Sequence, residues 1–218
     1  MPSIDSIGGF FFCKQPKGES EMRKIIVLEH LSLDGVIQAP GGKEEDLSGD
    51  FMHGGWTEPF SSQELGIWIR TQMHSEFDLL LGRKTYDQWA NYWPNHDDVW
   101  PEANRAMKYV VTRQSTDSRW ESTTFLTEPV EALKRLKQEE GPDLHVWGSG
   151  ELVHTLLANN LIDEVRLIVY PIIIGSGKRL FPDGNILPLQ LDVIEQQLMP
   201  NGVHVVRYER LQSEGGKI

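Results

Sequence analysis

Apolar residues in this chain form two kinds of segment that alternate along the sequence. Continuous apolar runs of strand length predict buried β-strands at residues 23–30, 77–81, 109–112, 144–147 and 165–174. Apolar positions at helical spacing predict helices over residues 61–74 and 83–89, after Pro129 and after Gly150. Two final strands, at residues 189–197 and 203–209, flank Asn201-Gly202 and predict a hairpin. The pattern therefore predicts an α/β fold with a mostly parallel sheet and an antiparallel edge.

Capping residues and one long loop refine this picture. Ser61 and Ser62 are hydroxyl residues suited to cap the helix that follows them, and Thr127 precedes an acid and a proline that suit a helix start. The stretch at residues 32–60 is rich in glycine and proline and has no regular apolar period. Loops this long in compact domains are usually functional or mobile, and we expect the same of this one.

Length and charge narrow the possible classes of function. The 218 residues, of which 39% are hydrophobic, suffice for one globular domain. We place this domain at residues 23–211, after a poorly ordered extension at 1–22 and before a tail at 212–218. The net charge of −11 argues against a nucleic-acid or anionic-membrane binder, because both need a basic face.

Cysteine and histidine usage excludes further classes. Cys13 is the single cysteine, so the chain can form neither an intrachain disulfide nor a cysteine zinc site, and a reducing cytoplasm is the simplest location. The seven histidines are scattered without metal-ligand spacing. No apolar run approaches the roughly 20 residues of a membrane helix. We therefore expect a cytoplasmic protein without a metal site.

Two predicted strand-to-helix turns have the composition of anion sites. Gly82-Arg83-Lys84-Thr85 opens a helix, whose free N–H groups favour an anion, and its two cations add charge. Gly148-Ser149-Gly150 opens another helix, and its glycines permit close backbone approach to a pyrophosphate. It is not the Rossmann fingerprint, which would require glycine in place of Val153. Taken singly, each segment is also compatible with an ordinary turn before a helix, and for Gly148-Ser149-Gly150 the two interpretations are equally good.

Thr112 and Arg113 end a third predicted strand. A hydroxyl and a guanidinium there suit a ribose 2′-phosphate, which would select NADPH over NADH, although a surface arginine is the simpler interpretation of Arg113 alone. Ligands of open α/β sheets bind at the carboxyl ends of the strands, and all three segments fall at such ends. Together they predict a binding site for NADPH.

These segments also occur in an order typical of one family. The order is Ser32-Leu33-Asp34-Gly35, Gly82-Arg83-Lys84-Thr85, Val111-Thr112-Arg113, Gly148-Ser149-Gly150, residues 161–167 and residues 171–177. Over residues 23–211 the chain resembles the dihydrofolate reductase superfamily. It is most similar to the C-terminal reductase domain of bacterial riboflavin biosynthesis, in a stand-alone form, because the zinc deaminase signature is absent from the sequence.

The resemblance implies a three-layer α/β/α fold with a central sheet of about eight strands. It further implies NADPH as cofactor, often a homodimer, and a loop at residues 32–37 that covers the nicotinamide. The cofactor-binding residues that it implies are Gly35, Gly82, Arg83, Lys84, Thr85, Thr112, Arg113, Gly148, Ser149, Gly150, Glu151 and Leu152.

The substrate half of the site is predicted from isolated residues, whereas the cofactor half is predicted from contiguous segments. Reduction of a C=N or C=O bond needs a proton. Asp34 or Glu64 would orient the substrate or help to deliver this proton if burial raised the pKa of the carboxyl, and water is the alternative donor. Trp56, together with the aromatic residues of segment 89–93, would wall in a flat ring. Lys178, in a glycine-rich turn, would bind a substrate phosphate. Each of these residues also has a structural interpretation, as a turn or helix-start acid, a core aromatic or a solvated cation.

The sequence thus predicts a soluble NADPH-dependent reductase of a small heterocycle, such as a pteridine or 5-amino-6-ribosylaminouracil phosphate. Two alternatives stay open. The first is a non-catalytic nucleotide-binding module that retains the fold, and the second is a structural dimer without a ligand. Oxidation of NADPH in the presence of flat heterocycles would distinguish a reductase from the non-catalytic module. Failure to bind any dinucleotide would favour the structural dimer.

Overall fold

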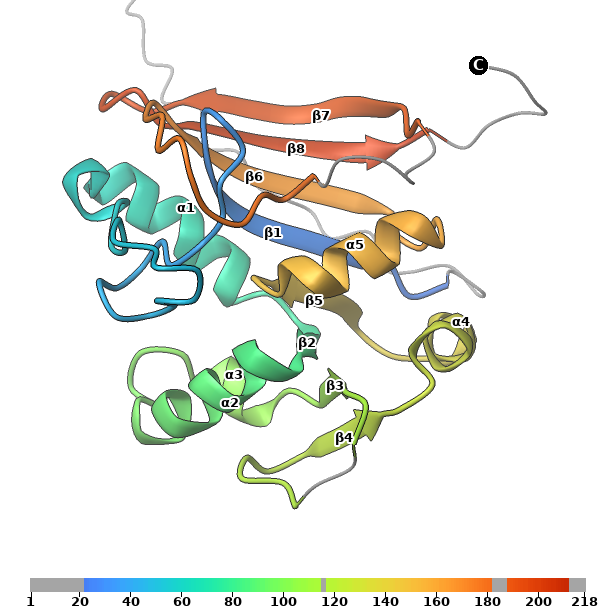
Figure 1. Cartoon of the computed structure of the whole chain (residues 1–218). Coiled ribbons are helices and arrows are strands. Elements are labelled where there is room, and N and C mark those ends of the chain that lie inside the picture. Colours follow the sequence, from blue (N-terminus) through green and yellow to red (C-terminus); the bar gives the residue numbers. More distant parts are fainter. Residues whose placement is uncertain (1–21, 115–116, 182–187, 212–218) are drawn as a thin grey trace, which may run out of the picture.

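The computed structural model describes residues 22–114, 117–181 and 188–211 (Figure 1). Residues 1–21 of the predicted extension and the predicted tail at 212–218 lie outside the described residues. The strands are β1 (Ile25–Ser32), β2 (Phe77–Gly82), β3 (Lys108–Val111), β4 (Thr123–Leu126), β5 (Asp143–Trp147), β6 (Glu164–Tyr170), β7 (Leu191–Leu198) and β8 (His204–Arg210). The helices are α1 (Gln63–Met73), α2 (Arg83–Tyr92), α3 (Pro101–Arg105), α4 (Pro129–Gln138) and α5 (Gly150–Ala158), with 3-10 turns η1 (Glu58–Phe60) and η2 (Trp93–Asn95).

Within these described parts, the strands form one eight-stranded sheet in the order β4-β3-β2-β5-β1-β6-β8-β7. Strands β1 to β6 pair in parallel, whereas β8 is antiparallel to both β6 and β7. The predicted mostly parallel sheet with an antiparallel C-terminal hairpin is therefore confirmed. All carboxyl ends of the parallel strands lie along one edge of the sheet, where ligands of such sheets bind.

Helices cover both faces of the sheet, and the side chains of β1 alternate between them. Ile25 and Val27 pack with residues of α4 and α5 in one apolar cluster. Ile26 and Leu28 pack on the other face with residues of α2 and α3, and α1 adds partly buried side chains there. This alternation explains why the continuous apolar run of β1 forms a central strand, since both of its faces are buried.

The boundaries of several elements have clear physical causes. The Ser62 hydroxyl accepts a hydrogen bond from the Leu65 N–H and caps α1, as predicted. In contrast, α4 has Glu128 at its N-cap without a side-chain bond, so the predicted cap by Thr127 is wrong. Strand β6 ends at Tyr170 rather than continuing to residue 174, because Pro171 has no N–H for the ladder. The sequence did not predict β4, η2 or α3.

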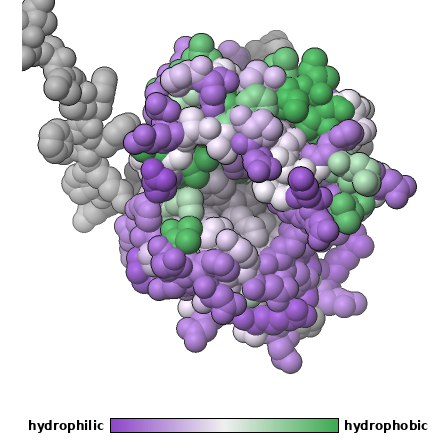
Figure 2. All heavy atoms as spheres, turned by 90° about the vertical axis from the view of Figure 1, so that its left-hand side faces the viewer, coloured by the Kyte–Doolittle hydropathy of each residue, from purple (hydrophilic) through white to green (hydrophobic). Residues whose placement is uncertain are grey.

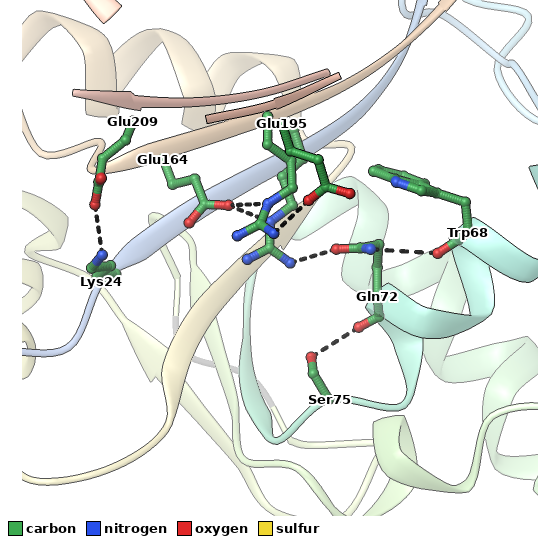
Figure 3. A network of polar contacts seen from close by, with 9 residues as sticks. Lys24, Trp68, Gln72, Ser75, Glu164, Glu195 and Glu209 are labelled. Carbon is green, nitrogen blue, oxygen red and sulfur yellow. Dashed lines mark hydrogen bonds and ion pairs between the residues drawn. The ribbon is translucent and has the colours of Figure 1, made fainter. Parts of the chain in front are cut away.

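A buried polar network joins the antiparallel part of the sheet to α1 (Figure 3). The Glu164 carboxylate accepts from the guanidinium groups of Arg166 and Arg207, at 2.6 and 2.9 Å. Arg166 also donates to the Gln72 side chain of α1 at 2.6 Å, and Arg207 donates to Glu195 of β7 at 2.8 Å. Burial alone would raise the pKa of Glu164, but the hydrogen bond from Arg166 and the two positive charges outweigh it and lower that pKa. The network thus holds an ionised carboxylate inside the fold.

Candidate active site

A cavity of about 1710 Å³ opens at the carboxyl ends of the parallel strands. Figure 2 views this side of the molecule and shows its surface hollowed near the middle, with many hydrophilic residues around the hollow. The floor comes from the ends of β1, β2, β3 and β5, and one wall comes from the loop after β1, including residues between Ile37 and Ser48. The predicted functional role of the long loop is consistent with this position. The cavity is large enough for a dinucleotide and a second small molecule.

The two predicted anion turns meet at this cavity. The Ser149 hydroxyl accepts a hydrogen bond from the Gly82 N–H at 2.9 Å and donates one to the Thr85 hydroxyl at 2.8 Å. Ser149 precedes α5, whereas Gly82 and Thr85 lie at the start of α2. The N-terminus of α2 and that of α5 therefore lie side by side and are directly connected. The first N–H groups of a helix have no carbonyl partner within that helix, so two sets of anion-binding donors converge here.

The backbone of the second turn has an unusual conformation. Gly148 has a φ of 62°, and Ser149 follows with a φ of 68°. This region suits glycine but is rarely adopted by serine, and such strained residues are concentrated at functional sites. The hydrogen bonds of the Ser149 side chain to Gly82 and Thr85 help to stabilise this unfavourable backbone conformation. A Cβ added to Gly150 would stand 2.8 Å from Cδ1 of Ile37, so glycine also allows the loop after β1 to approach α5 closely.

Charged residues surround the joined turns. Arg83 forms an ion pair with Asp87 one turn along α2, at 2.8 Å, and Lys84 is exposed beside it. Thr112 and Arg113 line the cavity at the end of β3, and the Arg113 side chain is exposed. Of the residues predicted to bind a cofactor, the structure brings together at this cavity Gly82, Arg83, Lys84, Thr85, Thr112, Arg113, Gly148, Ser149, Gly150, Glu151 and Leu152.

Gly35 and Asp34, by contrast, lie outside the cavity lining, in the turn that follows β1. The Asp34 carboxylate accepts hydrogen bonds from the N–H groups of Ile174 and Gly175 and from the Ser32 hydroxyl. Desolvation opposes ionisation, but these bonds outweigh it and lower the pKa of Asp34 to about 2. Asp34 therefore fastens two loops together as a carboxylate, and the structure does not support the prediction that it handles a proton.

Three other predicted residues also differ from expectation. Glu64 is exposed in the first turn of α1 and does not line the cavity, so its position fits the favourable interaction of an acid with the helix dipole. Trp56 is a buried residue of the long loop itself, and its indole N–H donates to the Gln38 carbonyl at 2.8 Å. Lys178 lines the cavity, but its ammonium group is paired with the Asp46 carboxylate. Glu64 and Trp56 therefore lie outside the cavity lining, whereas Lys178 lies at the cavity with its ammonium group already paired.

Glu29 is a buried acid of the cavity that the sequence did not predict as a site residue. It lies near the end of β1, lines the cavity and is 4% exposed. Its Oε1 atom is buried without a hydrogen-bond partner. Burial, and to a lesser extent the charge of Glu45, raises the pKa of Glu29 well above its ordinary value. An acid inside the apolar run of β1 was the available signal, because unpaired acids are rarely buried without a functional reason.

Comparisons with known proteins identify the family of this chain. The model of the RibD C-terminal domain family matches residues 23–205. Among relatives from Bacillus subtilis (strain 168), the uncharacterized protein YyaP is 26% identical over 195 residues, which cover 86% of this chain and 95% of YyaP. The uncharacterized protein YwjB is 32% identical over 161 residues, which cover 73% of this chain and 83% of YwjB.

Two solved structures share the fold. One is a protein from Shewanella sp. PV-4 named for riboflavin biosynthesis, with a TM-score of 0.66 and 21% identity over 87% of this chain and 99% of that chain. The other is a pyrimidine reductase-like protein from Corynebacterium diphtheriae, with a TM-score of 0.57 and 14% identity over 88% of this chain and 93% of that chain. With the family model matched over most of the described domain, the chain belongs to the RibD C-terminal domain family.

Proposed function

We propose that this chain is an NADPH-dependent reductase that acts on a small planar heterocycle. The observation that carries the proposal is the junction of the α2 and α5 N-termini through Ser149 at one cavity. Membership of the RibD C-terminal domain family supports a reductase-like role. Two helix N-termini with adjacent cations form a donor set for a dinucleotide with several phosphates, which favours this function over a purely structural one.

The residues at the junction fit a nicotinamide dinucleotide phosphate. We assign the turn at Gly148 and Ser149 to the pyrophosphate, and the turn at Arg83 and Lys84 to further phosphate charge. Arg113, beside the Thr112 hydroxyl, is assigned to the 2′-phosphate because a guanidinium binds phosphate oxygens in a forked geometry. When bound, a reduced nicotinamide supplies a hydride.

Glu29 is assigned as the proton donor in place of Asp34 and Glu64. A carboxyl that stays protonated near neutral pH can give its proton to the substrate nitrogen or oxygen while the neighbouring carbon is reduced. The O–H bond of Glu29 breaks, the new N–H or O–H bond forms, and solvent then returns a proton to the carboxylate. The raised pKa and the unpartnered Oε1 of Glu29 support this role.

The proposal includes a small-molecule substrate, a homodimer and a cytoplasmic location, without nucleic-acid or membrane partners. The net charge of −11 supports the absence of nucleic-acid binding. In the described residues, no helix combines the length and apolarity needed to cross a bilayer. The edge strand β7 exposes Val193, Ile194 and Leu198, as strands covered by a second subunit often do.

Arg113→Ala tests the cofactor assignment. We expect this change to weaken NADPH binding by about 10- to 100-fold and to leave NADH binding unchanged, because a charge-assisted hydrogen bond to the 2′-phosphate is lost. Titration calorimetry with each nucleotide measures the effect. Arg135→Ala, which removes an exposed arginine of α4 outside the cavity, is the matched control and should bind both nucleotides normally.

Two outcomes would contradict the proposal. If the native chain binds neither NADPH nor NADH, the cofactor assignment is wrong. If Arg113→Ala loses affinity for both nucleotides equally, Arg113 does not read the 2′-phosphate. Binding of NADPH without oxidation by any member of a heterocycle panel would instead favour the non-catalytic nucleotide-binding module.

A further inference from the structure

Four tryptophans form one cluster at the part of the cavity between α1 and α2. Trp100 is at its centre, with ring centroids 5.5 Å from Trp89, 5.1 Å from Trp93 and 5.8 Å from Trp147. All four line the cavity, although they come from α2, η2, the residue before α3 and the end of β5. Leu28, Ile69 and Met73 pack with them and also line the cavity. We call these seven residues the tryptophan end.

Two indole N–H groups of the tryptophan end have no acceptor. Trp93 Nε1 and Trp147 Nε1 are buried without a hydrogen-bond partner among the residues that the structure describes. In the same protein, Trp100 donates to the Met73 carbonyl at 2.9 Å, and Trp120 donates to Asn104 at 2.8 Å. Buried donors are nearly always paired, so the two exceptions indicate that an acceptor is supplied by a bound molecule or by water. Trp147 is in register with Leu28 on β1, and both side chains pack in the cluster on the α2 face of the sheet.

The cations of the cavity are engaged elsewhere. Among the described residues that line it, the lysines and arginines are Arg83, Lys84, Arg113, Lys178 and Arg179. The Arg83 guanidinium lies over the ring of Phe125 on β4 and pairs with Asp87. Lys178 pairs with Asp46, and Arg179 with Asp34. Lys84 and Arg113 belong to the turns assigned to the cofactor. An apolar wall without a cation disfavours a phosphate strongly, because a buried charge requires a partner.

We propose that the tryptophan end binds an uncharged aromatic heterocycle with carbonyl-type acceptor atoms, so that the substrate of this chain has no phosphate group. The ring stacks among the indoles, and its acceptors take the N–H groups of Trp93 and Trp147. This inference rests on the proposed function, since it names the substrate class of that site. It excludes the phosphorylated aminouracil that the sequence left open, and it removes the predicted role of Lys178.

Matched pairs of ligands test the inference. Titration calorimetry of the full chain compares thymidine with its 5′-monophosphate, inosine with its 5′-monophosphate, and riboflavin with flavin mononucleotide. Each titration is run with and without saturating NADP⁺. A phosphorylated ligand that binds at the turns assigned to the cofactor is then recognised because NADP⁺ displaces it. In the presence of NADP⁺, we expect the uncharged member of at least one pair to bind at least about tenfold more tightly than its phosphorylated partner, because the tryptophan end has no cation to pair with a phosphate.

Tryptophan variants then locate the binding. Trp93→Phe and Trp147→Phe keep an aromatic ring but remove the N–H, and each should weaken the uncharged ligand by about 3- to 10-fold, the usual effect of one lost hydrogen bond. Trp120→Phe, a buried tryptophan outside the cavity lining, is the control and should bind as the native chain does. Either cavity variant suffices if the other is poorly folded by circular dichroism.

The results separate this inference from the proposed function. Tighter binding of the phosphorylated partners, no binding of any uncharged ring, or equal binding by Trp93→Phe, Trp147→Phe and the native chain would overturn the inference. None of these outcomes bears on the affinity for NADPH. Conversely, a chain that binds an uncharged ring through Trp93 and Trp147 but binds no nicotinamide nucleotide would retain the inference and disprove the reductase proposal.

Discussion

Glu29→Gln is expected to lower kcat by about 10²- to 10⁴-fold, the usual contribution of a positioned general acid. Glutamine has nearly the shape of a protonated glutamate, so the buried side chain keeps its packing but loses the proton it would transfer. NADPH oxidation with the most active compound of a heterocycle panel measures the loss. The cofactor affinity should change little, because Glu29 belongs to none of the segments assigned to the phosphates.

The pH dependence of the native chain gives a second measure of the same group. The donor is the protonated carboxyl, so kcat should be constant below the raised pKa of Glu29 and should fall as the pH rises through it. In Glu29→Gln this fall should disappear. Glu64→Gln is the matched control, because it makes the same change on an exposed acid of α1 outside the cavity. Activity lost in Glu64→Gln and retained in Glu29→Gln would disprove the assignment.

Glu164→Ala is expected to destabilise the fold by about 3–5 kcal/mol, because it leaves the buried guanidinium of Arg166 and the half-buried guanidinium of Arg207 without their shared carboxylate. Arg166 would keep only its bond to Gln72, and Arg207 only its bond to Glu195. Urea denaturation measures the free energy of unfolding. Glu195→Ala is the control from the same network, since this side chain is 38% exposed and pairs with Arg207 alone. Its loss should cost no more than about 1 kcal/mol.

The contribution of Glu164 should also depend on pH with a definite sign. Its pKa is lower in the folded state than the value of about 4.3 expected for an unfolded chain. A carboxyl of this kind stabilises the fold above the unfolded pKa, and the stabilisation is lost as the pH falls through the folded pKa. The native chain should therefore lose more stability on acidification than Glu164→Ala does. Equal acid sensitivity of the two would show that Glu164 is not held as a carboxylate.

The parts of the fold that depend on local sequence were predictable. Apolar runs located β1, β2 and β5, and the Ser62 cap located α1, because these signals act within a few residues. Strand β4 was missed because its four residues have no alternating pattern and its side chains are only half buried or exposed. This strand forms because it pairs with β3, and the local sequence gives no signal for that pairing.

The candidate site also has one part that local sequence predicts and one part that it does not. The glycines, hydroxyls and cations of the phosphate turns are contiguous in sequence, and their position at strand ends could be predicted. The proposed substrate half is assembled by register and packing instead. Trp147 lies beside Leu28 because β1 and β5 pair in register, and Trp100 contacts both Trp89 and Trp147 across different elements. Asp34 misled the prediction because its loop partners, Ile174 and Gly175, are distant in sequence.

The Ser149 hydroxyl has a consequence for the order in which this chain acquires its structure. It joins positions 67 residues apart, so the two predicted anion turns can meet only after β2 and β5 have paired within the sheet. Contacts of such sequence separation form late in folding, since they require closure of long loops. Neither turn on its own forms the whole of the proposed cofactor site, and a partly folded chain would present only its separate halves. A dinucleotide that spans both turns would therefore bind selectively to the finished sheet and shift the folding equilibrium toward it.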